Sequence, residues 1–356
     1  DEIYRLNLMS AVVSSLALLM FFNLLIFIFK ELNLSEELNS VKNNISDEVI
    51  YNISLASVFI LAFSKTFWDT ANAIEVYSLH TFFLVTNIYL FLKANSFNPK
   101  ENDLENQREK KWLLFAFVLG LSFTNHLSTI FLSVGFLYLY FAVNGFNKIS
   151  FKRILILSIP FLLGYSVYLY LFVRAENSVI SWGYPNNFEN FWRHFTGKQF
   201  SIWMFSSFEN AGKQFSYFTT NYPLEFFYIP LLIAVPGLYE ISKKSKKLFY
   251  FTILLFGFCI LYAINYDIYD IDSYFLLAFI VTAIWAAFGF LFLVKKFKDS
   301  KAISFAIILT CLIPLSQNYS KVDKSKSYFV EDYTINIFNT APENSIIITS
   351  QWDFFI

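Results

Sequence analysis

Apolar residues recur along the chain in ten runs, which short polar connections separate. The runs cover 8–29, 49–63, 76–93, 112–122, 127–143, 154–173, 224–239, 248–264, 273–294 and 302–315. A membrane-spanning helix needs roughly 17–25 mostly apolar residues, and a short or broken one needs fewer. The pattern therefore predicts an all-α polytopic membrane protein, a helix bundle of about ten spans. Two of the runs, 112–122 and 127–143, also fit a single long broken helix.

Basic residues are distributed unevenly between alternate connections. The connections 30–48, 93–111, 144–153, 240–247 and 295–301 hold 18 of the 27 Lys and Arg residues. The others, 64–75, 123–126, 174–223, 265–272 and the tail from 316, hold eight although they are longer in total. Since cytoplasmic loops of membrane proteins are enriched in Lys and Arg, the first set is predicted to be cytoplasmic and the second to face outward.

Composition supports a membrane protein and excludes several other classes. Hydrophobic residues make up 56% of the chain and charged residues 15%, against about 25% charge in an ordinary soluble domain. The net charge is zero, so nothing favours nucleic acid as a partner. Cys259 and Cys311 lie in apolar runs, without metal-ligand spacing. No nucleotide-binding glycine motif is present. The abundance of Phe, Ile, Asn and Lys hints at a bacterial source, which predicts the inner membrane as the location.

The first outward connection, 64–75, concentrates polar chemistry between two apolar runs. Its sequence includes WDTANAIEVY, with Lys65, Trp68, Asp69 and Glu75 close together and Tyr77 just beyond. If 67–80 is one helix, then Asp69, Asn72 and Val76 share a face. Carboxylates at membrane depth cost about 2.5–3.5 kcal/mol on insertion scales, which favours a polar pocket. A water-exposed loop is the alternative.

The other outward turns carry their own candidate chemistry. Asn125 and His126 lie in GLSFTNHLS, where the histidine is either a structural hydrogen-bond donor or a ligand for an oxyanion or a sugar hydroxyl. Arg174 ends a span and either snorkels to the interface or pairs with a phosphate, and Trp182 follows it.

The turn at 265–275 holds three acids and three tyrosines, Asp270, Asp272 and Tyr274 among them. These acids could bind a polyol, pair with Arg174 or hold a divalent metal, although their spacing matches no EF-hand loop.

Two further segments have a distinct character. From Phe188 to Phe195, aromatic residues recur at helical spacing, which predicts an amphipathic helix over 188–200 in the membrane interface or packed on the bundle. After residue 316 the chain reads as a polar helix and then, at 345–350, as a strand. We therefore expect a membrane domain at 1–315 and, at 316–356, the start of a soluble extracytoplasmic domain that the chain truncates.

The ordered set of outward turns resembles a known family. The segments that carry the resemblance are FSKTFWDTANAIEVYSLH, LGLSFTNHLS, LYLFVRAENSVISWGYPNNFENFWRHFTGKQF, NYDIYDIDSYFLLAF and PENSIIITSQWDFF. They are similar to bacterial multi-span proteins related to the eukaryotic plexin-domain protein O-mannosyltransferase. The resemblance implies a GT-C-type glycosyltransferase, which moves a sugar, mannose or another hexose, from a polyprenyl-phosphate donor to a protein or other acceptor outside the cytoplasm. The donor is a substrate, and no cofactor is expected.

The resemblance also implies roles for the residues. Such enzymes place an Asp or Glu base in the first outer loop, which is expected upstream of Asp1, so no base is assigned here. Supporting catalytic candidates are Glu75, His126 and Arg174. Substrate-binding candidates are Lys65, Trp68, Asp69, Tyr77, Asn125, Trp182, Asp270, Asp272 and Tyr274. No metal ligand is assigned. A transporter or lipid flippase is the main alternative, and a membrane scaffold is a third.

Overall fold

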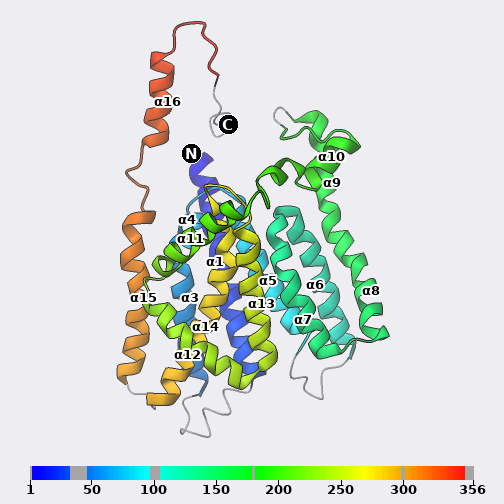
Figure 1. Ribbon diagram of the computed structural model, residues 1–356, viewed down its shortest axis with the longest axis vertical. Coiled ribbons are helices and arrows are strands. Elements are labelled where there is room, and N and C mark those ends of the chain that lie inside the picture. The colour runs from blue at the N-terminus through cyan, green and yellow to red at the C-terminus, as the bar shows by residue number, and fades with distance from the viewer. Residues whose placement is uncertain (1, 33–45, 97–104, 179–180, 298–300, 349–356) are drawn as a thin grey trace.

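The computed structural model shows an all-helical protein (Figure 1). It describes residues 2–32, 46–96, 105–178, 181–297 and 301–348. Within these ranges there is no β-strand, only an isolated bridge between Met204 and Tyr266. The prediction of an all-α protein is confirmed.

The α-helices and the 3₁₀ segments (η) follow one another with short connections. Their bounds are α1 Glu2–Glu31, α3 Ser46–Ala62, α4 Lys65–Ala71, α5 Val76–Ala94, α6 Glu105–Asn125, η1 Leu127–Leu132, α7 Ser133–Asn144, α8 Lys148–Tyr165, η2 Ser166–Tyr168, α9 Leu169–Arg174, η3 Ala175–Asn177, α10 Phe188–Phe195, η4 Lys198–Trp203, α11 Phe208–Glu225, α12 Ile229–Lys244, α13 Lys246–Ala263, η5 Ile271–Phe275, α14 Leu276–Phe297, α15 Lys301–Val322 and α16 Phe329–Thr340.

Several helices are long and apolar enough to cross a membrane. Among the described residues five helices meet this condition, or up to seven if each of two bent helix pairs is one span. The predicted runs 76–93, 112–122 and 302–315 do form helices (α5, α6 and α15) but are not among these seven. In α6 the reason is visible in the sequence, because its first turns read ENQREKK. A multi-pass membrane protein is supported, whereas the count of ten spans is not confirmed.

Helix α14 forms the centre of the bundle. Nearly all of its side chains are buried. It packs closely on α12, where a Cβ added to Gly237 would lie 1.8 Å from the Trp285 carbonyl oxygen and one added to Gly289 would lie 1.9 Å from that of Ile233. Only glycine allows two helix backbones to approach this closely. A polar contact in the same region is the 3.0 Å hydrogen bond from Trp285 Nε1 to Thr252 Oγ1.

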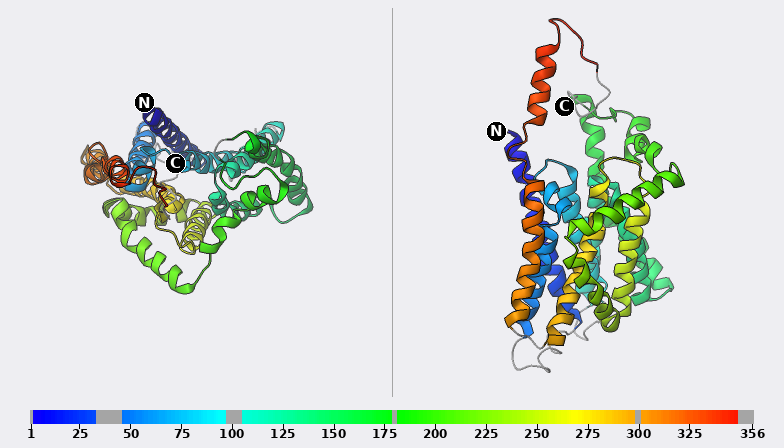
Figure 2. Two further views of the ribbon diagram at one scale, coloured as in Figure 1. Left: turned by 90° about the horizontal axis from the view of Figure 1, so that it is seen from above. Right: turned by 60° about the vertical axis from the view of Figure 1, so that its left-hand side comes forward.

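The predicted outward segments gather at one end of the bundle. Helices α4 and α10 and the start of α1 lie there, and α16 projects away from the bundle at the same end (Figures 1 and 2). Which side of the membrane this end faces stays a prediction. Helix α15 continues through the predicted boundary at 316 to Val322. Residues 345–348 form no strand, and the rest of the predicted strand lies outside the described residues.

Two sharp bends shape this end. Helices α3 and α4 meet at 74°, and α11 and α12 meet at 98°. At the second bend Phe227 and Tyr228 both have positive φ values, 51° and 64°, which are uncommon for residues other than glycine. Residues 67–80 are not one helix, since α4 ends at Ala71 and α5 begins at Val76, so the face that Asp69, Asn72 and Val76 would share on that supposition does not form.

Candidate functional site

A cleft of about 160 Å³ lies at the end of the bundle, against helix α4. We call it the acidic cleft. It is lined by Lys65, Thr66, Asp69, Thr70, Ala73, Glu75, Tyr77, Asp270, Asp272, Ser273 and Lys324. Six of these residues are sequence-predicted candidates from two separate turns, and the fold brings them together. Their roles remain predictions.

A buried carboxylate holds α4 in place. Glu225, at the end of α11 and only 4% exposed, accepts hydrogen bonds from the Thr66 backbone nitrogen (2.9 Å) and from its hydroxyl (2.5 Å). Asn318 of α15, fully buried, donates to the backbone carbonyls of Phe63 (2.9 Å) and Glu225 (3.1 Å). These contacts tie both bends to α15. Because Thr66 lines the acidic cleft, they also fix one of its walls.

The acidic cleft contains four carboxylates and two ammonium groups. Lys65 Nζ lies 3.5 Å from Asp272 Oδ2, and Lys324 Nζ lies 2.5 Å from Asp69 Oδ1. All four of these side chains are partly exposed, so water screens both pairs. Glu75 caps the start of α5 with its backbone and exposes its side chain. Carboxylates in excess over cations suit hydrogen bonding to the hydroxyl groups of a polyol.

Next to Tyr77, on the side of the acidic cleft that it lines, lies a cluster of aromatic rings and a histidine. The ring of Tyr77 lies 5.5 Å from that of His126 and 6.1 Å from that of Tyr274. Tyr266 in turn lies 5.0 Å from Tyr274. Asn125 does not line the acidic cleft but donates to the Val76 carbonyl (3.2 Å), which ties the α6 end to the start of α5.

His126 is held as a neutral ring. Its Nδ1 accepts from the Ser128 backbone nitrogen (3.2 Å) and lies 2.6 Å from the Ser128 hydroxyl. That hydroxyl also lies 2.8 Å from Nε2 of the buried His80. Burial lowers the pKa of His126 from its usual 6.5 to about 4. Since Nδ1 accepts, the proton of the neutral ring is on Nε2, and His126 can act as an uncharged hydrogen-bond donor.

Three further sequence-predicted residues, Trp68, Arg174 and Trp182, do not line the acidic cleft. Trp68 packs between the rings of Phe63 (5.4 Å between ring centroids) and Tyr319 (6.1 Å), which is a structural role. Arg174 ends α9 with an exposed side chain and does not line the acidic cleft. Pairing of the acidic turn with Arg174, one of the alternatives for that turn, is not seen among the described residues, where Asp272 pairs with Lys65.

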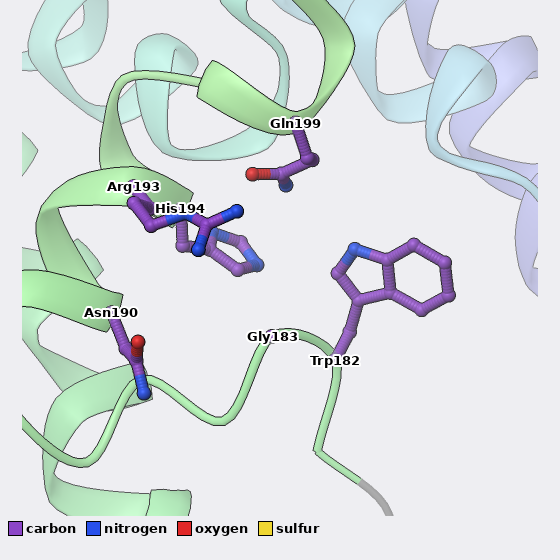
Figure 3. A pocket seen from close by; sticks show the side chains of 6 residues that line it. All are labelled: Trp182, Gly183, Asn190, Arg193, His194 and Gln199. Atoms are coloured by element: carbon purple, nitrogen blue, oxygen red, sulfur yellow. The ribbon is translucent and has the colours of Figure 1, made fainter.

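Trp182 lines a second, larger pocket of about 340 Å³, which we call the arginine pocket (Figure 3). Its other lining residues are Gly183, Asn190, Arg193, His194 and Gln199. The helix predicted over 188–200 is shorter, since α10 covers Phe188–Phe195 and a separate 3₁₀ segment follows. Helix α10 provides three of the lining residues, and the 3₁₀ segment provides Gln199.

Several residues that line or support the acidic cleft were not predicted from the sequence. Thr66, Thr70 and Ser273 are small polar residues next to predicted ones, and proximity was their only signal. Lys324 comes from the tail after α15. Glu225 carried one usable signal, a carboxylate at the edge of an apolar run. Within the described ranges, no group of three or more His, Cys, Asp or Glu side chains is arranged to hold a metal ion.

Comparisons with known proteins give one match. No curated protein and no solved structure matches the chain. Residues 1–150 match the family model described as the protein O-mannosyl-transferase TMEM260 N-terminal domain. This range includes α4, the start of α5 and His126, and therefore one side of the acidic cleft with the ring beside it. The first 150 residues are thus similar to the N-terminal domain of a protein O-mannosyl-transferase.

Proposed function

We propose that this protein is a membrane glycosyltransferase of the GT-C type. It transfers a sugar, mannose or another hexose, from a polyprenyl-phosphate donor to a hydroxyl group of a protein or other acceptor outside the cytoplasm. The observation that carries the proposal is the acidic cleft, because four of its charged or aromatic residues lie in the segment similar to the O-mannosyl-transferase domain.

In this proposal the acidic cleft binds the sugar and its acceptor. Glu75, Asp270 and Asp272 accept hydrogen bonds from hydroxyl groups, which orients the reacting atoms. Lys65, one of the two cations of the cleft, can offset negative charge on the departing lipid phosphate. His126 donates a hydrogen bond without carrying charge. The catalytic base is assigned to none of these residues.

The test measures sugar transfer by the full chain. Membranes that contain it receive a labelled mannosyl polyprenyl phosphate and a serine- or threonine-containing acceptor peptide, and label in the peptide is counted. Asp272→Asn is expected to lower the transfer rate by about tenfold to a hundredfold, the loss for one charged hydrogen bond in a transition state. The ion pair with Lys65 is partly exposed, so the variant keeps its stability.

Asp267→Asn is the matched control. Asp267 lies in the same turn and accepts from Asn210 (2.8 Å), but it does not line the acidic cleft. Its transfer rate is expected within about threefold of the unaltered chain. Equal losses in the two variants would contradict the assignment of the site. Absence of transfer together with substrate counterflow in proteoliposomes would favour the transporter alternative.

A further inference from the structure

The arginine pocket presents hydrogen-bond donors to one small volume. Arg193 and His194 extend from α10 toward the indole of Trp182, with Gln199 on a third side (Figure 3). The backbone at Gly183 adopts a φ of 70°, which favours glycine there. Asn190 Nδ2 donates to the Tyr184 carbonyl (3.1 Å) and so ties the loop of Trp182 to α10.

His194 is set up as a donor. The Tyr168 hydroxyl lies 2.7 Å from Nδ1 of His194, and burial lowers the pKa of this ring below its usual value. Donation from the hydroxyl to Nδ1 leaves the proton of the neutral ring on Nε2. The Arg193 guanidinium contributes further N–H groups in a planar fork.

The charge of the arginine pocket is purely positive. None of its lining residues is acidic, and among the described residues no carboxylate forms an ion pair with Arg193. A planar guanidinium can donate two parallel hydrogen bonds to a phosphate group, and the neutral donors beside it can donate to the same group. In the acidic cleft, by contrast, each of the two ammonium groups is paired with a carboxylate.

The position of the arginine pocket points to a lipid. Helix α10 packs through Phe191 and Phe195 on Tyr168 and Tyr165, with ring centroids 5.9 and 5.0 Å apart. Those tyrosines belong to the candidate span Lys148–Asn177, of whose most apolar window only 6% is buried in the protein. Such a span presents its side chains to acyl chains. The pocket therefore lies where a lipid that rests on this span would place its headgroup.

We propose that the arginine pocket binds the phosphate ester headgroup of a membrane lipid, with Arg193 as its principal contact. The hydrocarbon chain of that lipid would lie along α8 and α9. This binding goes beyond the proposed function, because it needs no sugar transfer. It concerns lipid phosphates as a class, whether or not they carry a sugar.

The test measures lipid binding directly. Immobilised full chain in neutral detergent is titrated with radiolabelled dioleoyl phosphatidic acid, and dioleoylglycerol, which lacks the phosphate, serves as the reference lipid. Phosphatidic acid is expected to bind about tenfold more tightly than dioleoylglycerol, the margin for one charge-assisted hydrogen-bonded contact. Arg193→Ala is expected to remove nearly all of this roughly tenfold preference for phosphatidic acid, and Arg193→Lys is expected to keep part of it.

Lys198→Ala is the matched control. Lys198 is an exposed cation five residues from Arg193 that does not line the pocket, and its loss is expected to weaken binding less than about twofold. Equal effects of Arg193→Ala and Lys198→Ala would overturn the proposal in favour of diffuse charge attraction. So would equal binding of the two lipids, or displacement by millimolar inorganic phosphate, which would indicate a free-anion site. Asp272→Asn, which tests the proposed transfer, is expected to leave this binding unchanged, so the two proposals fail separately.

Discussion

The acidic cleft and the arginine pocket lie at the same end of the bundle but are built in different ways. The acidic cleft draws on four stretches of chain: α4, the start of α5, the turn at 270–273 and Lys324. The arginine pocket comes entirely from residues 182–199. One site depends on long-range packing, and the other depends on a local helix and its loops.

Under the two proposals, this difference in construction matches a difference in task. A site that must orient reacting groups needs walls fixed by the core, and the buried contacts of Glu225 and Asn318 provide them. A site that captures a headgroup needs an accessible cation near lipid, and the exposed Arg193 provides it. The molecule thus separates a rigid polar cleft from a peripheral cationic pocket.

Removal of Glu225, which anchors a wall of the acidic cleft through Thr66, is predicted to change stability most. Glu225→Ala leaves the Thr66 backbone N–H and hydroxyl without their acceptor in a buried place. We expect the free energy of unfolding to fall by about 3 kcal/mol, as two buried donors lose their partner. Unfolding by heat in detergent, with loss of helical circular dichroism as the signal, measures the change.

Glu225→Gln is the control for this variant, because its amide oxygen can still accept from Thr66. We expect it to recover at least half of the loss, to within about 1.5 kcal/mol of the unaltered chain. Phosphatidic acid binding to folded Glu225→Ala protein should be unchanged. If that binding falls as well, the two regions are not independent.

A second test concerns the protonation of His126 beside Tyr77, Tyr274 and His80. Its pKa is about 4 in the folded protein and near 6.5 when unfolded, so the unfolded chain takes up the proton first as pH falls. This group's contribution to stability is therefore fully present above pH 6.5 and is lost toward pH 4. We expect a loss of about 2 kcal/mol, a figure that allows for partial exposure of the ring.

His126→Asn isolates this contribution from the carboxylates that titrate in the same range. Its side-chain oxygen takes the place of Nδ1 as acceptor for the Ser128 backbone nitrogen and does not titrate. The stability of the variant should therefore decline less between pH 6.5 and 4. Parallel pH curves for the two proteins would show that His126 does not carry this sensitivity.

The acidic cleft was predictable from sequence to the extent that its residues occupy the ends of spans. Lys65, Asp69, Glu75 and the acids at 270 and 272 are polar groups bordered by apolar runs, and span ends on one side of a membrane gather in space. Arg174 met the same criteria and is not in the cleft. The sequence offers no measure of the lateral distance between two span ends.

The sequence predicted a polar connection at 64–75 and a span from residue 76, but not that α4 would form within that connection and end at Ala71. No Gly or Pro marks residues 72–75, so local sequence favours a continuous helix. Two contacts accompany the break: a local hydrogen bond from the Ser78 hydroxyl to the Thr70 carbonyl (2.8 Å), and a long-range one from the Thr66 backbone nitrogen to Glu225. Glu225 is separated from Thr66 by 159 residues, and no local pattern links them.

The rim of the acidic cleft is predicted to contribute much less to stability than its buried anchor, Glu225. Lys324 pairs with Asp69 at 2.5 Å, yet the two side chains are 58% and 42% exposed. We expect Lys324→Ala to lower the free energy of unfolding by less than about 0.5 kcal/mol, and added salt to remove even that difference. The same thermal unfolding in detergent, at low and high salt, measures it. A loss above about 1.5 kcal/mol would mean that the tail after α15 holds the cleft together as firmly as the buried carboxylate does. A small loss would place the stability of the acidic cleft in its interior and leave its rim free to exchange ion pairs for substrate hydroxyl groups.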